Sequence, residues 1–179
     1  MITPAIRKAT ADDAATIASL MVEAIKETCA PAYRHNKRVI GMWCADKTPA
    51  NLASTISQRD NYTVVGIMND RIVGVGLMHR YGEIALCYVH PDYQRHGIGK
   101  ALLNDMERRA STLKIKTLIL KSTLNAVSFY QLHGFIDDGP KEMLLGEIRF
   151  QPMRKVLDTR LRMKPSYSPN PDPNPDKKA

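Results

Sequence analysis

Cysteine is scarce in this sequence, with three residues among 179. Cys29, Cys44 and Cys87 are odd in number, and none of them stands in a Cys-x-x-Cys pair. Disulfide frameworks and structural zinc sites both need cysteines at paired, short spacings. We therefore expect neither a disulfide scaffold nor a metal site.

Long hydrophobic runs are missing as well. No stretch approaches the roughly 18 apolar residues that a membrane-spanning helix requires. The first residues, Met1-Ile2-Thr3-Pro4, lack the basic and then apolar order of a secretory signal. The sequence therefore predicts a cytoplasmic protein that has no membrane partner.

Acidic residues are outnumbered, because 18 Asp and Glu stand against 26 Lys and Arg, which gives a formal charge of +8. This excess suits either a nucleic acid or a small polyanionic ligand. Nucleic-acid binders usually cluster basic residues with aromatic ones between them. Aromatic residues make up 6% of this chain, and its basic residues are scattered. We expect no nucleic-acid partner.

The end of the sequence differs in composition from the rest. Residues 164–179 hold five of the eleven prolines and one bulky apolar side chain, Tyr167. Such a segment cannot bury enough apolar surface to offset its ordering entropy. We interpret 164–179 as a disordered tail rich in Pro, Asn and Asp, and 1–163 as one domain with a single core.

The rest of the sequence alternates between strand and helix patterns. Together they predict a mixed α/β fold. Strands are predicted at 5–8, 62–68, 71–79, 83–89, 117–121, 142–145 and 150–157, and helices at 10–29, 36–44, 49–59, 98–113 and 125–134.

The strand at 83–89 is followed by a loop and then by Gly97-x-Gly99, where a helix begins. A glycine turn at a helix start lets backbone N–H groups approach an anion, and Arg95, His96 and Lys100 add positive charge. The spacing matches neither a P-loop nor a dinucleotide-binding glycine motif. The pattern predicts a pyrophosphate site, although a tight turn alone would give the same pair of glycines.

Two motifs in this region resemble those of the GNAT superfamily of N-acetyltransferases. Gln94-Arg95-His96-Gly97-Ile98-Gly99 is similar to the family's Gln/Arg-x-x-Gly-x-Gly/Ala turn, and it follows Val89-His90-Pro91 at a strand end. The run from Asn125 to Phe135 is similar to the second motif, Asn-Ala-x-x-Phe-Tyr-x-x-x-Gly-Phe. The resemblance covers about residues 4–162 and is strongest over 83–135.

The resemblance implies a mostly antiparallel sheet flanked by helices, with a V-shaped splay between the motif strand and the next strand. It also implies acetyl-CoA as cosubstrate, with no metal. The strand would hold the pantetheine arm and the turn the pyrophosphate. The implied cofactor residues are Cys87, Tyr88, Val89, Gln94, Arg95, His96, Gly97, Ile98, Gly99, Lys100, Asn125, Ser128 and Tyr130. We interpret Cys87 as inert packing, since the family transfers the acetyl group directly.

Two catalytic residues are predicted. Glu83 stands eleven residues before Gln94, where histone-acetylating members of the family place a glutamate base. An alternation of period two would put Glu83 on the same strand face as Cys87. A merely solvated Glu83 is the alternative, and His79 is the second candidate base. Tyr130 occupies the family position whose hydroxyl faces the departing CoA sulfur.

The acceptor is expected to be the primary amine of a small molecule. Tyr33 and Trp43 are candidate substrate contacts together with Glu83, although aromatic residues in a helical segment also suit a core. A protein lysine or N-terminus is the alternative acceptor. A non-catalytic acyl-CoA-binding regulatory module is the alternative from another class, and a homodimer is left open.

Overall fold

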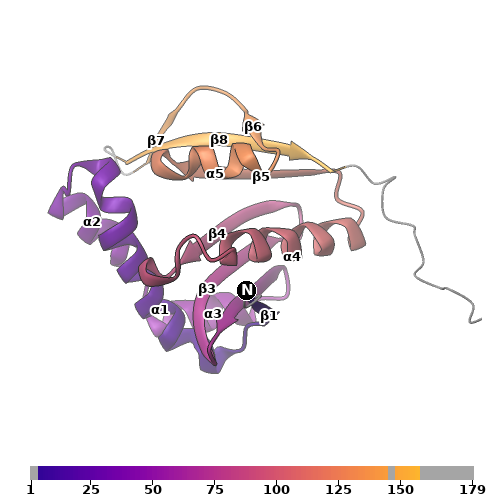
Figure 1. Cartoon of the computed structure of the whole chain (residues 1–179), viewed down its shortest axis with the longest axis horizontal. Coiled ribbons are helices and arrows are strands. Elements are labelled where there is room, and N and C mark those ends of the chain that lie inside the picture. The colour runs from indigo at the N-terminus through magenta and orange to yellow at the C-terminus, as the bar shows by residue number, and fades with distance from the viewer. Residues whose placement is uncertain (1–3, 145–147, 158–179) are drawn as a thin grey trace, which may run out of the picture.

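The computed structural model describes residues 4–144 and 148–157, which form one mixed α/β unit (Figure 1). Its strands are β1 (Ala5–Lys8), β2 (Asn61–Met68), β3 (Arg71–His79), β4 (Glu83–Val89), β5 (Thr117–Thr123), β6 (Ile136–Asp137), β7 (Glu142–Leu144) and β8 (Ile148–Val156). Its α-helices are α1 (Ala14–Glu23), α2 (Lys37–Cys44), α3 (Pro49–Ser57), α4 (Ile98–Thr112) and α5 (Val127–Leu132). The tail at 164–179 lies outside the described residues.

The strands form one sheet in the order β1-β2-β3-β4-β5-β8-β6, with β7 also paired to β8. Every pairing is antiparallel except that of β4 with β5, which is parallel. That parallel pairing joins only Glu83 to Ile119 and Ile84 to Leu120, after which the two strands diverge. Figure 1 shows the two resulting arms, one of β1–β4 and one of β5–β8. The predicted fold class and its splay are confirmed.

Two layers of helix cover the arm of β1–β4. Helix α4 packs on one face through Ile98, Leu102 and Met106, while α1 and α3 pack with Val65 and Val75 on the other. Helix α4 lies so close to the sheet that a Cβ on Gly74 would stand 2.7 Å from Cγ2 of Ile98. This close packing fixes where α4 begins, next to the end of β4.

The segment predicted as one helix over 10–29 is interrupted. A 3-10 turn, η1 (Ala11–Asp13), precedes α1, and a π-helical segment, η2 (Ala24–Cys29), follows it. A further 3-10 turn, η3 (Ala30–Tyr33), then leads toward α2. Thr10 is the N-cap of η1, and its backbone N–H donates to Oδ2 of Asp13 at 2.8 Å.

The second motif also folds differently from its prediction at one end. The helix predicted over 125–134 begins later than expected, because Asn125 lies inside a 3-10 turn, η5 (Leu124–Ala126), and α5 begins two residues after it. The C-terminal end of this helix lies where it was predicted. Gly134 follows α5 at φ +85°, and the backbone N–H of Phe135 donates to Tyr130 O at 3.1 Å. In the described part of the chain, no helix is long and apolar enough to cross a membrane.

Candidate active site

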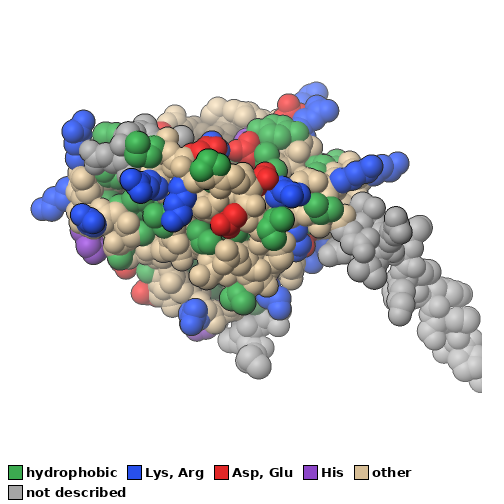
Figure 2. All heavy atoms as spheres, turned by 90° about the horizontal axis from the view of Figure 1, so that it is seen from above, with side chains coloured by type: hydrophobic (Ala, Val, Ile, Leu, Met, Phe, Trp, Pro, Cys, Tyr) green, Lys and Arg blue, Asp and Glu red, His purple; other side chains and the backbone are tan. Residues whose placement is uncertain are grey.

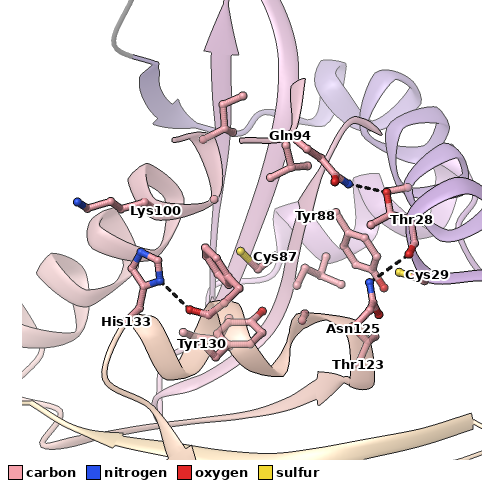
Figure 3. Close-up of a pocket in the computed structure, with 18 of the residues that line it drawn as sticks. Thr28, Cys29, Cys87, Tyr88, Gln94, Lys100, Thr123, Asn125, Tyr130 and His133 are labelled. Atoms are coloured by element: carbon pink, nitrogen blue, oxygen red, sulfur yellow. Dashed lines mark hydrogen bonds between the residues drawn. The ribbon is translucent and has the colours of Figure 1, made fainter. Parts of the chain in front are cut away.

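A cavity of about 660 Å³ lies where β4 and β5 separate (Figure 3). It runs along β4, past the turn that begins α4, and reaches η2 and α2. Its lining includes most of the predicted site residues, namely Trp43, Glu83, Cys87, Tyr88, Val89, Gln94, Arg95, Gly97, Ile98, Gly99, Lys100, Asn125 and Tyr130.

The divergence of the sheet leaves one edge of β4 unpaired inside this cavity. Cys87, Tyr88 and Val89 pair with β3 on one side, at Gly76, Val75 and Gly74. On the other side the pairing with β5 ends at Ile84. Backbone N–H and C=O groups of β4 are therefore available to an extended ligand that lies along the strand.

A β-bulge divides the side chains of β4 between the two faces of the sheet. The pairing register shifts between Leu77 and Met78, so that Ala85 has no partner of its own. As a result, Ile84 and Cys87 both face the core under α4, while Leu86 and Tyr88 face α1. The prediction that Glu83 and Cys87 share a face is wrong, because the extra residue reverses the alternation.

The turn after β4 has the features of an anion site. Gly97 begins α4 at φ +80°, and Arg95 also has a positive φ of 65°. The first backbone hydrogen bond of the helix runs from Ala101 N to Gly97 O. The N–H groups of Ile98, Gly99 and Lys100 therefore precede the helical hydrogen-bond ladder. Together with the Arg95 and Lys100 side chains, they suit a phosphate group.

On the α4 side of β4, the Cys87 thiol lies beside the Tyr130 hydroxyl (Figure 3). Burial raises the pKa of Cys87 to about 11, although the neighbouring Tyr130 hydroxyl lowers it somewhat. Burial also raises the pKa of Tyr130 well above 10, with Cys87 adding to the effect. Both groups are therefore protonated at neutral pH, which makes Cys87 a poor nucleophile and Tyr130 a hydrogen-bond donor.

Glu83 lies at the closed end of the splay, where β4 and β5 still pair. Its Oε2 accepts a hydrogen bond of 2.7 Å from the Tyr81 hydroxyl, and the Tyr81 ring stacks on His79 at 5.3 Å. His79 itself contacts Oδ1 of Asn61 through Nδ1 at 2.7 Å. Glu83 lines the cavity, whereas His79 does not.

The far wall of the cavity is aromatic. Trp43 on α2 packs edge-on against Tyr33 at 5.5 Å and Phe150 at 5.9 Å. Its side chain also contacts the Tyr88 hydroxyl. Burial raises the pKa of Tyr88 well above its usual value of 10, so Tyr88 is neutral.

The comparisons with known proteins agree with this geometry. The model of an acetyltransferase (GNAT) domain matches residues 29–157. The chain belongs to the GNAT acetyltransferase family. The predicted family and enzyme class are therefore confirmed at the level of the family.

One solved GCN5-related N-acetyltransferase, from Rhodopseudomonas palustris, superposes with a TM-score of 0.79 at 26% identity, over 88% of this chain and 98% of that one. PaiA N-acetyltransferase from Thermoplasma acidophilum, solved with coenzyme A, superposes with a TM-score of 0.74 at 24% identity, over 87% of this chain and all of that one.

A curated relative in sequence is an amino-acid acetyltransferase from Actinobacillus pleuropneumoniae serotype 5b (strain L20). It is 32% identical over 105 residues, which are 54% of this chain. The chain spans only 24% of the length of that relative.

Three predicted site residues of this GNAT chain lie outside the cavity lining: Tyr33, His96 and Ser128. Tyr33 is buried behind Trp43 and donates its hydroxyl to Arg149 O at 2.9 Å. His96 and Ser128 are exposed, and Nδ1 of His96 contacts Gln94 O at 2.8 Å. Tyr33 therefore supports the wall rather than forming its surface.

Sequence reasoning missed several lining residues. They include Thr28 and Cys29 in η2, Lys47 after α2, Lys121 and Thr123 on β5, Phe129 on α5 and His133 directly after α5. A period of two along β5 would have selected Lys121 and Thr123, because they lie two residues apart. Thr28 carries no sequence signal, since its position depends on the π-helical segment.

No group of three or more His, Cys, Asp and Glu residues that could hold a metal ion occurs within residues 4–144 and 148–157. Lysine and arginine side chains are spread over the face seen in Figure 2, with acidic and hydrophobic side chains between them. Over that face, the basic residues do not form the clustered band that a nucleic-acid backbone would need.

Proposed function

We propose that this chain transfers the acetyl group of acetyl-CoA to the primary amine of a small molecule. The observation that carries the proposal is the unpaired edge of β4, which runs through the cavity toward the turn that begins α4. An extended arm that ends in phosphates fits both features together. The solved PaiA neighbour holds coenzyme A, which supports the same ligand for this chain.

The cosubstrate would be held by backbone groups and by two cations. Amide groups of a pantetheine arm can pair with the free edge of β4 at Cys87 and Val89. The N–H groups that begin α4 would receive the pyrophosphate, with Arg95 and Lys100 beside it. Acetyl-CoA supplies the activated thioester, and the chain provides the binding, orientation and proton transfer.

Glu83 would act on the amine. An alkylamine with a pKa near 10.4 costs about 4 to 5 kcal/mol to present in its neutral form at pH 7. A carboxylate that accepts this proton, directly or through one water, contributes about 10² to 10⁴ in rate. The bulge in β4 supports this role, because Glu83 lies across the sheet from Cys87 and Tyr130.

Tyr130 would act on the leaving group. As the amine nitrogen bonds to the carbonyl carbon, the C–S bond breaks and negative charge develops on the CoA sulfur. A neutral hydroxyl can donate a hydrogen bond to that sulfur. Since the pKa of Tyr130 lies well above 10, the hydroxyl stabilises the thiolate and keeps its own proton. The sulfur finally takes a proton from solvent.

An amino acid is a second candidate acceptor, because the curated relative is named an amino-acid acetyltransferase. Lys47 and Lys121 line the cavity, and each would have to exchange its present partner, Asp46 or Glu142, for the carboxylate of an amino acid. A protein lysine or N-terminus and a non-catalytic acyl-CoA-binding module remain the alternatives. The aromatic wall of Trp43 and Phe150 favours a small acceptor over a peptide.

Release of free thiol from acetyl-CoA tests the proposal. The purified protein is given acetyl-CoA with small amines, amino acids, lysine peptides and peptides with free N-termini, and the acetylated product is identified by mass spectrometry. We expect a small amine or an amino acid to give the fastest release. Release with peptides alone would favour the protein-acetylating alternative. CoA binding without release for any acceptor would favour the non-catalytic module.

A further inference from the structure

Thr28 joins the two arms of the sheet at the open end of the splay. It lies in η2, the π-helical segment that continues α1 toward α2. Its hydroxyl oxygen accepts a hydrogen bond of 2.6 Å from Nε2 of Gln94, in the turn after β4. Its backbone oxygen accepts one of 3.1 Å from Nδ2 of Asn125, which follows β5. Figure 3 shows both bonds converging on Thr28.

These bonds connect the acceptor wall to two residues of the cofactor motifs. Pairing of β4 with β5 closes the splay at Glu83 and Ile84, and Thr28 bridges it beyond the other ends of these strands. The chain after Thr28 continues through η3 into α2, which carries Trp43. The position of the wall therefore depends on where the Gln94 and Asn125 side chains are held.

Each of the two amides still has a free acceptor. A side-chain amide has two donor hydrogens and a carbonyl oxygen. Within the described part of the chain, Oε1 of Gln94 and Oδ1 of Asn125 make no hydrogen bond. These oxygens can accept from the amide N–H groups of a pantetheine arm while the nitrogens remain bound to Thr28.

We propose that Thr28 is a positioning residue, which transmits cofactor binding to the acceptor wall. A cofactor that orders Gln94 and Asn125 also fixes η2 through Thr28. The inference rests on the proposed function, since it requires a CoA ligand. It adds a residue that contacts neither the reacting atoms nor the pyrophosphate, and a coupling between two binding sites.

Hydrogen exchange with coenzyme A as the probe tests the coupling. In the native protein we expect CoA to slow exchange at 95–102, where it binds, and also at 24–33, where Thr28 lies. In Thr28→Val, protection at 95–102 should stay within about twofold of native, whereas protection at 24–33 should fall about fivefold, as for one lost hydrogen bond. Thr28→Ser keeps the hydroxyl and should restore the native pattern.

Thr112→Val is the matched control. This substitution also removes a hydroxyl hydrogen bond, which Thr112 donates to Arg108 O at 3.0 Å. Thr112 lies at the end of α4, away from the cavity. Native protection at 24–33 in Thr28→Val would overturn the inference. If CoA protects residues 95–102 of the native protein but not 24–33, the inference is overturned and the proposed function is left intact. Absence of protection at both segments would overturn the proposed function together with the inference.

Steady-state kinetics separate positioning from a general loss of structure. With the amine that gives the fastest thiol release, Thr28→Val should raise the KM for the amine about fivefold, the value of one hydrogen bond. The kcat, and the Kd for CoA measured without amine, should change by less than about twofold. A fall in kcat with an unchanged amine KM would instead indicate a smaller folded fraction and contradict the positioning role.

Discussion

Two tyrosines with different surroundings stand at the two chemical ends of the proposed reaction. Tyr130 is buried between Phe129 and Phe135 and lies beside Cys87. Tyr81 is exposed and bonds to Glu83. Because the bulge in β4 puts Glu83 and Cys87 on opposite faces, the proposed reaction assigns the two tyrosines to different sides: Tyr81 would orient the Glu83 carboxylate, and Tyr130 would donate to the departing thiolate.

Replacing Tyr130 by Phe should lower kcat about tenfold to hundredfold, the range for a hydrogen bond to a charged group. The ring and its packing stay, so the KM for acetyl-CoA should change little. Steady-state rates of thiol release measure both constants. A Tyr130→Phe enzyme with native kcat would remove Tyr130 from the mechanism.

Tyr81→Phe should lower kcat/KM for the amine about two- to fivefold, because Glu83 loses the hydrogen bond that orients its carboxylate. Tyr62→Phe is the control, since Tyr62 donates a similar bond of 2.8 Å to the Asp105 carboxylate away from the cavity. An equal fall in kcat/KM in Tyr81→Phe and Tyr62→Phe would show that the Tyr81 hydroxyl affects only stability. The two rates and the two melting temperatures decide between these roles.

At the scale of elements, the start of α1 is held to β1 by one carboxylate. Asp13 accepts two bonds from Arg7, at 2.7 and 2.9 Å, and one from the Thr10 backbone at 2.8 Å. These partners lower the pKa of Asp13 to about 2, against the opposing effect of burial. A carboxylate with a lowered pKa stabilises the folded state above its unfolded pKa and loses that effect as the pH falls.

Asp13→Asn should therefore lower the free energy of unfolding by about 1 to 2 kcal/mol at pH 7. The difference from native should shrink as the pH falls from about 4 to about 2, since Asp13 of the native protein then becomes protonated in both its unfolded and its folded state. Urea denaturation at several pH values measures this difference in the free energy of unfolding. Asp12→Asn, at an exposed neighbour, is the control. A difference that persists at pH 2 would contradict the ion pair as its source.

The sequence predicted the order of the elements better than their internal irregularities. The alternation of apolar residues identified β2, β3 and β4, and the two motifs placed the turn and Tyr130. The bulge at Ala85 and the π-helical segment at Ala24–Cys29 left no signal, because both are set by packing against neighbouring elements. For this reason, the face of Glu83 and the contact of Thr28 could not be predicted.

At the scale of the whole molecule, the charge of +8 is only partly explained by the site. Arg95, Lys100, Lys47 and Lys121 line the cavity, with Glu83 as its only acidic residue among those described. Lys47 and Lys121 each pair with a carboxylate, of Asp46 and Glu142. Arg95 and Lys100 have no such partner in the described part of the chain, so they are free to bind phosphates.

Lys100→Met should weaken CoA binding about fivefold and should reduce its dependence on salt, because one charge beside the phosphates is removed. Calorimetric titration at rising sodium chloride measures both effects. Lys141→Met, an exposed position away from the cavity, should change neither. An unchanged salt dependence in Lys100→Met would place the phosphates elsewhere.

The central claim is that the acetyl group passes directly from acetyl-CoA to an amine within the cavity between β4 and β5. Intact-mass spectrometry of the protein with acetyl-CoA, before and after the best amine acceptor is added, tests it most directly. We predict an unmodified chain before addition, and afterwards acetylated amine and free thiol in equal amounts. An acetyl group that accumulates on Cys87 and then passes to the amine would contradict direct transfer.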